Sequence, residues 1–288
     1  MQRIGITGAS GLIGTAVRQA LQARGDEPVA LGRRRDWQPD DLATLDAVIN
    51  LGGASLGGRR WNAAYKRQIR DSRVLNTASL AGAIARSDRP IRLVSASAVG
   101  FYGDRGETVL GESAAAGEGF LADVCRAWEA AAADAVPTAA LVRTGIVVSE
   151  RGGALARLAP LARWGLAGPL GSGRQFWPWI ALADHARALL HLLDRPELTG
   201  PFNLVAPQPV RQRDFARALG RAVRRPTVLP TPGWALRLAA GEFGGELLAS
   251  QRAVPTALAG SGFTFAHPEL GPVLAACVRR RARAAGKD

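Results

Sequence analysis

The sequence predicts an α/β fold built on a doubly wound parallel sheet, and three observations lead to that prediction. In the first half of the chain, short β-branched runs alternate with longer helical stretches, which is the pattern of a parallel sheet covered by helices on both faces. Several expected strands are continuous apolar runs, such as Ala47-Val48-Ile49, as a sheet buried on both faces requires. A glycine-rich turn also joins the first expected strand to the first expected helix.

The expected elements alternate along the chain as far as residue 205. The predicted strands are Arg3–Thr7, Pro28–Leu31, Ala47–Leu51, Arg92–Ser95, Ala139–Arg143 and Pro201–Val205. The predicted helices are about Gly11–Arg24, Asn62–Arg86, Phe120–Ala135 and Leu182–Leu193.

The amino-acid composition of the sequence changes after Arg143. Residues 151–179 are rich in glycine and aromatic side chains, and we expect them to form one long functional loop, because long loops in compact domains usually serve a function. About eighty C-terminal residues follow, with the pattern of short helices broken by prolines. The sequence therefore predicts two units: residues 1–145 with 180–206 form the sheet domain, and residues 146–179 with 207–288 form a small, mainly helical cap.

The formal net charge of +13 comes almost entirely from arginine, since Lys66 and Lys287 are the only lysines. A basic protein attracts phosphate, but these arginines are scattered, and the dense run Arg279-Arg280-Arg281 lies at the C-terminal end. No nucleic-acid-binding motif accompanies them. We therefore expect an arginine-rich surface and no nucleic acid partner.

The cysteine count and the hydropathy pattern indicate the compartment. The only cysteines, Cys125 and Cys277, match no metal or redox spacing, so we expect a reducing environment and no metal site. No segment approaches the ~20 apolar residues that span a bilayer. The expectation is a cytoplasmic protein without a membrane partner.

The segment from Thr7 to Gly14, Thr-Gly-Ala-Ser-Gly-Leu-Ile-Gly, lies between an expected strand and an expected helix. Its glycines allow a tight turn and close approach of the backbone to a pyrophosphate, and the helix N-terminus offers free N–H groups to the phosphates. This strand–turn–helix context distinguishes a Rossmann dinucleotide site from a chance glycine triplet. The expected cofactor contacts are Gly8, Ser10, Gly11, Leu12, Ile13 and Gly14.

The end of the second strand distinguishes NADP from NAD. NAD-binding proteins usually carry a carboxylate there, whereas NADP-binding proteins use arginine for the 2′-phosphate. The sequence is Leu31-Gly32-Arg33-Arg34-Arg35, and Arg33 is the best candidate because guanidinium pairs with phosphate in a bidentate manner. NADP is therefore the expected cofactor, and the small residues after the third strand place Leu51 and Gly52 at its adenine-ribose end.

Taken together, these motifs resemble the extended short-chain dehydrogenase/reductase family. More narrowly, they resemble its atypical subgroup of sugar-nucleotide epimerase-like proteins, in which an NAD-dependent epimerase/dehydratase-like body carries a short C-terminal module. The segments that carry the resemblance are Thr7–Gly14, Asp46–Gly53, Arg60-Trp61, Asp71-Ser72-Arg73, Phe101–Asp104, Trp128-Glu129, Arg143–Gly145, Gly171–Gln175, Trp179-Ile180, Gln251–Pro255 and Gly262–Phe265. The resemblance implies that Arg33, Leu51, Gly52, Arg73 and Val147 contact the dinucleotide.

Typical members of that family use a serine or threonine and a Tyr-x-x-x-Lys pair, in which the tyrosine is the general acid/base. Ser97 occupies the serine position in this chain. The tyrosine and lysine positions hold Phe120 and Val124, neither of which can relay a proton. Tyr102 is the nearby hydroxyl that could substitute, so Ser97 and Tyr102 are the catalytic candidates, each with the alternative of a purely structural hydrogen bond.

Two functions remain open from the sequence. The first is an NADP-dependent oxidoreductase or epimerase (an isomerase) that acts on a small polar, sugar-nucleotide-like molecule, with Arg174, Gln175, Trp177 and Trp179 as the substrate wall in the cleft between sheet and cap. The second is an NADP-binding regulatory or interaction protein that has lost its chemistry. A homodimer is left open as the assembly.

Overall fold

A sheet of six strands, all parallel to their neighbours, forms the centre of the structure. The computed structural model describes residues 1–285. The strands are β1 (Arg3–Thr7), β2 (Glu27–Leu31), β3 (Ala47–Asn50), β4 (Arg92–Ala98), β6 (Ala140–Thr144) and β10 (Gly200–Leu204). Their order across the sheet is β2-β1-β3-β4-β6-β10, so the chain reverses its direction of travel between β1 and β3. Open α/β sheets bind ligands at such a reversal, outside the carboxyl ends of the strands.

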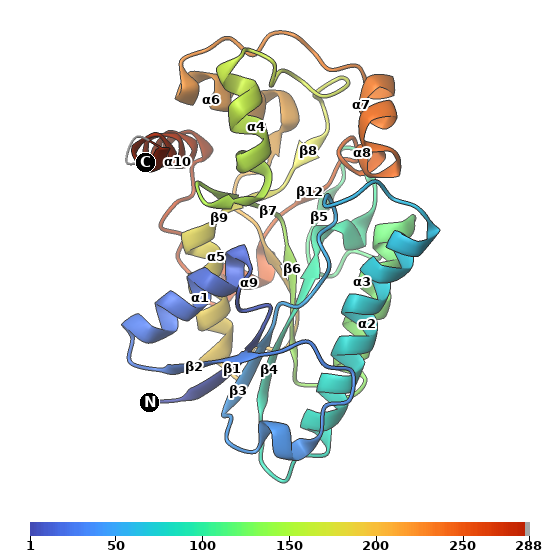
Figure 1. The fold of residues 1–288 in the computed structure, drawn as a ribbon, viewed down its shortest axis with the longest axis vertical. Helices are drawn as coiled ribbons and strands as arrows, with labels where there is room; N and C mark the ends of the chain where they lie inside the picture. Colours follow the sequence, from blue (N-terminus) through green and yellow to red (C-terminus); the bar gives the residue numbers. More distant parts are fainter. Residues whose placement is uncertain (286–288) are drawn as a thin grey trace.

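Successive side chains of a strand point to opposite faces of the sheet, and helices bury both of these faces. On one face, Ile6 and Ile49 belong to a core shared with helices α1 and α5. On the other, Val48 and Leu93 pack with side chains of α2 and α3. The covering helices are α1 (Leu12–Ala23), α5 (Leu182–Leu193), α2 (Ala63–Ala85) and α3 (Phe120–Ala133). The predicted doubly wound architecture is confirmed (Figure 1).

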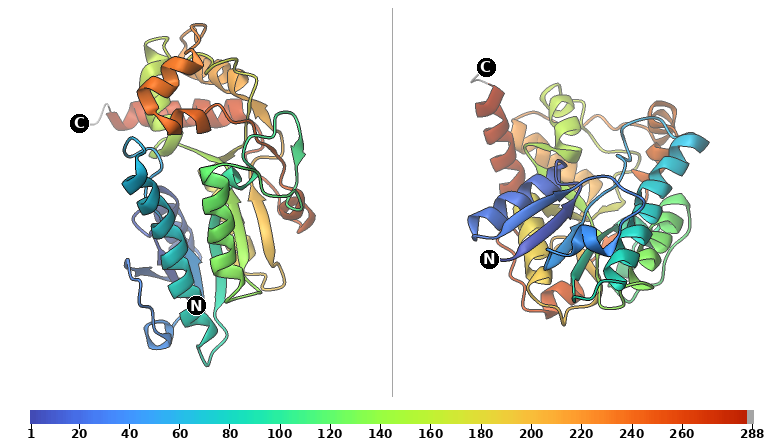
Figure 2. Two further views of the ribbon diagram at one scale, coloured as in Figure 1. Left: turned by 90° about the vertical axis from the view of Figure 1, so that its right-hand side faces the viewer. Right: turned by 60° about the horizontal axis from the view of Figure 1, so that its bottom comes forward.

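A second layer of helices lies above the carboxyl ends of the strands (Figure 1). It contains α4 (Gly153–Arg163), α6 (Gln212–Val223), α7 (Gly233–Ala240), α8 (Glu242–Glu246) and α10 (Leu270–Ala285), with the short strands β7 (Ile146–Ser149), β8 (Phe176–Trp177), β9 (Trp179–Ala181) and β11 (Val210–Arg211). Its core includes Leu155, Trp179, Phe215 and Leu274, which come from four segments far apart in the sequence. The turned views in Figure 2 show α10 lying within this upper layer.

The expectation of one long loop over residues 151–179 is wrong, because this segment contains a helix. Residues from Gly153 to Arg163 form α4, and their alanine, leucine and arginine side chains all have high helix propensity. Pro160 lies inside α4 without ending it. Glycines and aromatic residues on either side hid this helical stretch in the sequence.

The C-terminal part of the chain crosses from the upper layer to the sheet and then returns. After α8, strand β12 (Arg252–Ala253) pairs with β5 (Val109–Leu110), and α9 (Thr256–Gly260) follows. Leu258 and Phe263 join the core of the sheet before α10 returns to the upper layer. The C-terminal segment thus ties the two layers together.

Candidate functional site

The turn between β1 and α1 is closed so tightly that a side chain has no room at Gly8 or at Gly14. Gly8 has a φ of 67°, in the left-handed region, and a Cβ there would lie 2.9 Å from the carbonyl oxygen of Leu51. A Cβ on Gly14 would overlap the carbonyl oxygen of Gly8. The Gly11 N–H donates to that same oxygen at 2.9 Å. These glycines therefore bring the start of α1 close to the tips of β1 and β3.

The N-terminus of α1 is left open toward solvent. Gly11 is the N-cap and offers no side-chain hydrogen bond, and the first turn contains no acidic residue. Gly8, Ser10 and Gly11 are exposed, whereas Leu12 and Ile13 are half-buried. The first backbone N–H groups of a helix lack intrahelical partners, so this end of α1 presents free donors and a positive dipole end to an anion.

Thr7 ties the tip of β1 to the tip of β3. Its hydroxyl donates to Asn50 Oδ1 at 2.7 Å and accepts from the N–H groups of Leu51 and Gly52, each at 3.0 Å. Asn50 in turn donates to Thr77 Oγ1 at 2.8 Å on α2. The structure thus fixes Leu51 and Gly52 beside Gly8, at the point where the sheet reverses.

Three consecutive arginines follow β2, and they differ in what they contact. Arg34 pairs with Asp41 at 2.6 Å and with Asp36 at 3.5 Å. Asp41 holds the pKa of Arg34 above its usual value through a hydrogen bond. Arg33 is exposed, and within the described residues 1–285 it has no acidic partner within 4.0 Å. Asp36 is 77% exposed and lies 3.5 Å from Arg34, so among the described residues the first two arginines of the run differ in their pairing with acids.

Arg73 lies beneath the loop that follows β3. Its Nη2 donates to the carbonyl of Ala54 at 3.0 Å, and its Nη1 donates to that of Ile69 at 3.1 Å. The guanidinium stacks over the ring of Trp128, 5.2 Å from the ring centroid. Burial lowers the pKa of Arg73 below its usual value, but an arginine remains charged in proteins. A positive charge is therefore held behind the Gly52-Gly53 turn.

Val147 and the start of α4 approach the first helix from above. Val147 is half-buried and packs against the core that contains the sheet. A Cβ on Gly152 would contact the Leu12 side chain at 3.5 Å, and Arg157 Nη2 donates to the carbonyl of Gly57 at 2.7 Å. Sequence reasoning missed Gly152 and Arg157, because the segment that contains them was expected to be a loop.

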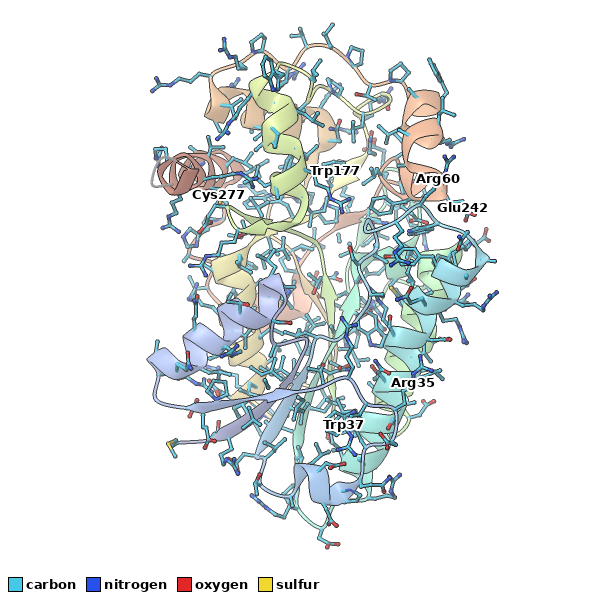
Figure 3. All side chains as sticks on the ribbon, in the orientation of Figure 1. Arg35, Trp37, Arg60, Trp177, Glu242 and Cys277 are labelled. Carbon is cyan, nitrogen blue, oxygen red and sulfur yellow. The ribbon has the colours of Figure 1, made fainter. Side chains whose placement is uncertain are left out.

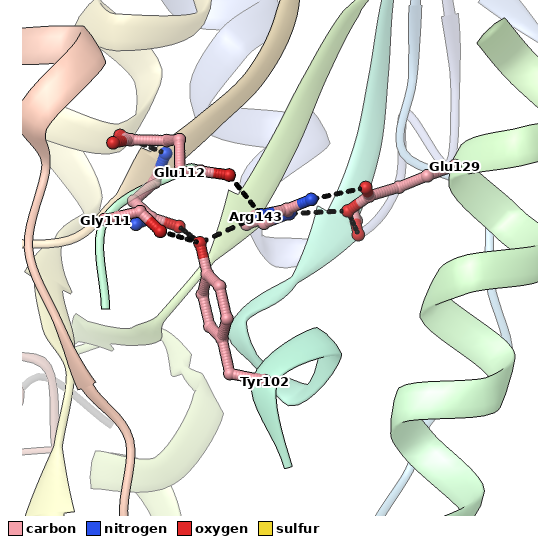
Figure 4. Close-up of polar contacts among 7 residues, drawn as sticks. Tyr102, Gly111, Glu112, Glu129 and Arg143 are labelled. Carbon is pink, nitrogen blue, oxygen red and sulfur yellow. Dashed lines mark hydrogen bonds and ion pairs between the residues drawn. The ribbon is translucent and has the colours of Figure 1, made fainter. Parts of the chain in front are cut away.

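Ser97 lies near the carboxyl end of β4 and is almost fully buried. Its hydroxyl donates to Glu129 Oε1 on α3 at 2.6 Å. Glu129 also accepts two hydrogen bonds from Arg143 on β6, from Nε and from Nη2, both at 2.8 Å (Figure 4). The side chains of Arg143 and Glu129 are only 5% and 9% exposed. Ser97 is thus part of a buried, fully paired ionic cluster.

Tyr102 belongs to the same cluster and is itself completely buried. Its hydroxyl accepts from Arg143 Nη1 at 2.9 Å and donates to Asn203 Oδ1 at 2.8 Å, as Figure 4 shows for the arginine. Burial raises the pKa of the phenol, although Arg143 counteracts part of that effect. The Tyr102 hydroxyl therefore helps to hold the Arg143 guanidinium in position. The spacing of residues in the sequence did not reveal that Arg143 is its hydrogen-bond partner.

An aromatic cluster surrounds Phe120, the residue that the resemblance aligns with the family's tyrosine. Phe120 begins α3 and packs edge-on against Trp61, with ring centroids 5.2 Å apart. Phe243 on α8 also packs against Trp61, with ring centroids 5.6 Å apart. Lys66 Nζ lies 4.7 Å from the Phe120 ring centroid and pairs with Glu242 Oε2 at 2.6 Å. The C-terminal module therefore docks on α2 and α3 at this point, and Figure 3 labels Glu242 beside Arg60 there.

The four residues expected to form the substrate wall divide into two groups. Arg174 is exposed, whereas Gln175, Trp177 and Trp179 are 7%, 5% and 1% exposed. The Trp177 indole N–H donates to the carbonyl of Leu247 at 3.2 Å (Trp177 is labelled in Figure 3). The Gln175 amide donates to the carbonyl of Leu170 at 3.0 Å. Large aromatic side chains contribute strongly to a core when buried, so Trp177 and Trp179 stabilise the core of the upper layer, and of the four residues Arg174 alone is exposed.

His185 lies in the interior, beside the carboxyl end of β6. His185 is buried and shares a 3.0 Å hydrogen bond with Thr144 Oγ1; burial lowers its pKa to about 3, so it is neutral at physiological pH. Among the residues that the structure describes, no group of three or more His, Cys, Asp or Glu side chains could hold a metal ion. In the same part of the chain, no helix is long and apolar enough to cross a bilayer.

Comparison with known proteins adds family information to this geometry. Residues 4–205 match the model of the NAD dependent epimerase/dehydratase family, and residues 231–277 match a domain of unknown function, DUF1731. The chain is 43% identical over 289 residues to an epimerase family protein of Mycobacterium tuberculosis, an alignment that covers 94% of this chain and 96% of the relative.

Two solved structures with more than 30% identity share the fold. One is the human epimerase family protein SDR39U1, crystallised with NADPH, which aligns with a TM-score of 0.89 and 32% identity over 96% of this chain and 99% of its own. The other is a nucleoside-diphosphate sugar epimerase from Corynebacterium glutamicum, with a TM-score of 0.76 and 33% identity over 99% of this chain and 61% of its own.

Proposed function

The chain belongs to the NAD dependent epimerase/dehydratase family, and from that membership we propose that it is an NADPH-binding oxidoreductase or epimerase-like enzyme. Its proposed substrate is a small polar molecule of the sugar-nucleotide class. The observation that carries the proposal is the open N-terminus of α1 beside a turn in which Gly8 and Gly14 leave no room for a side chain. Such a turn lets the backbone approach a pyrophosphate.

The residues of this turn and its surroundings fit NADPH in particular. Arg33 is exposed and free of an acidic partner among residues 1–285, so it can pair with a 2′-phosphate. Leu51 and Gly52 border the reversal of the sheet, and Arg73 supplies positive charge behind them. The human relative that shares the fold was crystallised with NADPH. We propose that the pyrophosphate lies over Gly8, Ser10, Gly11, Leu12, Ile13 and Gly14, and that Val147 contacts the dinucleotide.

The upper layer is proposed to cover the substrate. The sequence assigned residues 1–145 and 180–206 to dinucleotide binding and residues 146–179 and 207–288 to the cap. Within the described residues, Leu258 and Phe263 of the second unit pack into the core of the sheet, so the cover is proposed for the upper layer alone. Arg174 offers an exposed positive charge, while Gln175, Trp177 and Trp179 are buried. Both cysteines, Cys125 and Cys277, are free and buried, which supports a reducing compartment such as the cytoplasm.

The proposed chemistry uses Ser97 and Glu129 in place of the family's tyrosine and lysine. Bound NADP(H) would exchange a hydride with the substrate carbon. In the oxidising direction the substrate hydroxyl would give its proton to Ser97 Oγ while Ser97 gives its own proton to the Glu129 carboxylate, whose Oε1 lies 2.6 Å away. Reduction by NADPH would run the same relay in reverse, from protonated Glu129 through Ser97 to the substrate oxygen. Arg143 keeps Glu129 oriented through two 2.8 Å hydrogen bonds, and Tyr102 positions Arg143.

A screen of carbonyl and nucleotide-sugar substrates, followed by absorbance of NADPH, tests this function. Ser97→Ala should then lower turnover about 10²–10⁴-fold, the usual contribution of general acid–base catalysis, while NADPH affinity stays unchanged. Turnover that is unaffected by Ser97→Ala would place the chemistry elsewhere.

The second candidate is an NADPH-binding regulator without catalysis. The observation that favours it is the apolar cluster at Phe120, where Trp61 and Phe243 pack against the position of the family tyrosine. The same screen separates the two functions, since firm NADPH binding with no turnover on any substrate supports the regulator.

A further inference from the structure

The upper end of the molecule exposes large apolar side chains that the proposed function does not use. Trp164 at the end of α4 is 82% exposed and Leu166 is 54% exposed, while Val228 and Leu229, in the segment after α6, are 75% and 62% exposed. Single exposed apolar residues are normal on protein surfaces. A contiguous group marks an interaction site.

These residues come from two segments that run side by side. The Thr231 N–H donates to the carbonyl of Pro169 at 2.8 Å, and the Gly171 N–H donates to that of Thr231 at 2.8 Å. Further along, a Cβ on Gly165 would contact the carbonyl oxygen of Pro226 at 3.5 Å. We refer to Trp164, Leu166, Val228 and Leu229 as the apolar rim.

A basic groove of about 470 Å³ adjoins the apolar rim. It is lined by Arg217, Arg221, Arg224 and Arg225, together with Pro169, Gly220, Pro226, Thr227 and Val228, so that Val228 belongs to both features. Arg217 pairs with Asp214 at 3.3 Å. Among the residues that the structure covers, the other three arginines have no acidic partner within 4.0 Å, and no acid lines the groove. Their charge is therefore available to an external anion.

We propose that this face docks on the surface of an anionic lipid bilayer. Tryptophan is enriched at membrane–water interfaces, and basic residues beside apolar ones are the composition of proteins that lie on a membrane without spanning it. Lipid phosphates pair with the arginines of the groove, while the apolar rim enters the boundary between headgroups and acyl chains. The face is formed by the end of α4, by α6 and by the segments that follow them, which belong to the upper layer of helices (Figure 1).

The charge of the groove argues against a second copy of the chain as the occupant. A two-fold contact brings the same patch of both subunits into one interface, so the arginines of two basic grooves would gather there and repel one another. An anionic bilayer suits both features of the face, because it offers phosphate to the basic groove and hydrocarbon to the apolar rim at neighbouring depths.

Co-sedimentation of the full chain with vesicles tests the proposal. Binding is expected to vesicles of equal parts phosphatidylglycerol and phosphatidylcholine, and not to phosphatidylcholine alone. The double substitution R221Q/R225Q is expected to weaken binding roughly thirtyfold, since each basic residue near an anionic surface contributes about fivefold. R67Q/R70Q removes the same charge from exposed positions of α2 and should change binding far less.

A second variant separates insertion from simple attraction. Brominated phosphatidylcholine mixed with phosphatidylglycerol should quench tryptophan fluorescence in the wild type, and W164S/L166S should lose most of that quenching; both side chains are exposed, so the fold is retained. Equal weakening by both double-arginine variants, or quenching that W164S/L166S leaves intact, would overturn the proposal. Displacement from vesicles by soluble glycerophosphate at the same phosphate concentration would overturn it in favour of a small-anion site. A dimer of the free protein that W164S/L166S dissociates would overturn it in favour of a second copy.

Discussion

Arg143 on β6 and Glu129 on α3 form a two-pronged ion pair in the interior, with Nε–Oε1 and Nη2–Oε2 distances of 2.8 Å. Ser97 donates to this carboxylate, and Tyr102 accepts from this guanidinium. The pair therefore joins the sheet, a covering helix and both hydroxyls considered for catalysis. Its integrity determines the geometry beside the carboxyl ends of β4 and β6.

Removing the carboxylate of Glu129 should strongly destabilise the protein. Glu129→Ala leaves Arg143 buried and unpaired, which costs about 3–5 kcal/mol in comparable buried pairs. Urea unfolding measures the loss. Glu107→Ala is the control, because Glu107 pairs with Arg211 at the surface and is 60% exposed, and such pairs contribute about 0–1 kcal/mol. Similar losses in the two variants would show that the buried pair is not a major source of stability.

The phenol of Tyr102 should titrate above the usual value. Tyr65 is the only other tyrosine, so in Tyr65→Phe the near-ultraviolet absorbance change of ionisation reports Tyr102 alone. Burial raises its pKa, and the midpoint should therefore lie above ~10. The folded state then retains this proton after the unfolded state has lost it, so stability falls as the pH rises past ~10. A midpoint at or below that value would contradict the buried position.

A side chain at Gly8 should abolish dinucleotide binding in a protein that still folds. Gly8→Val demands a left-handed φ of 67° and brings the new Cβ within 2.9 Å of the Leu51 carbonyl oxygen, so the turn can no longer approach a pyrophosphate. Calorimetric titration with NADPH measures the effect, and circular dichroism checks the fold. Gly271→Ala on α10, where a Cβ meets nothing within 4 Å, should bind as the wild type does. Retained binding by Gly8→Val would mean that the turn has only a structural role.

Acid should destabilise the protein partly through His185. Burial lowers its folded-state pKa to about 3, whereas the unfolded chain takes up the proton near ~6.5. Between these values the unfolded state binds more protons, so this histidine makes stability fall as the pH falls, by up to ~1.4 kcal/mol per pH unit. Comparing the pH dependence of unfolding in wild type and His185→Gln isolates the contribution. An unchanged slope in the variant would contradict the neutral, buried state.

The sequence predicted the sheet because strand and helix periodicities are local. β1 was predicted with the observed bounds, Arg3–Thr7, and α5 with the observed bounds, Leu182–Leu193. The glycine turn was recognisable because its spacing is fixed by the close packing at Gly8 and Gly14. Helix α4 was missed because its alanine- and leucine-rich stretch lies between glycine clusters and contains Pro160.

The partners of the candidate site residues could not be predicted from local sequence. Glu129 and Arg143 meet only after α3 has packed across the sheet, and Tyr102 finds Asn203 from a strand 101 residues away. Aromatic composition also does not show which way a side chain points. Trp177 and Trp179 were expected at a substrate wall, and they lie in the core of the upper layer.

Titration of NADPH and NADH into wild type, Arg33→Ala and Arg34→Ala tests the central claim most directly. Arg33 is exposed without an acidic partner among residues 1–285, whereas Arg34 is paired with Asp41 at 2.6 Å. Arg33→Ala should therefore remove a hydrogen-bond donor to the 2′-phosphate, and Arg34→Ala should remove a surface ion pair. A hydrogen bond to a charged group contributes about 1.5–3 kcal/mol, and Arg33→Ala should therefore weaken NADPH roughly ten- to a hundredfold while leaving NADH and the Arg34→Ala protein little changed. Equal affinity of the wild type for both dinucleotides, or an NADPH affinity that Arg33→Ala does not alter, would contradict the account.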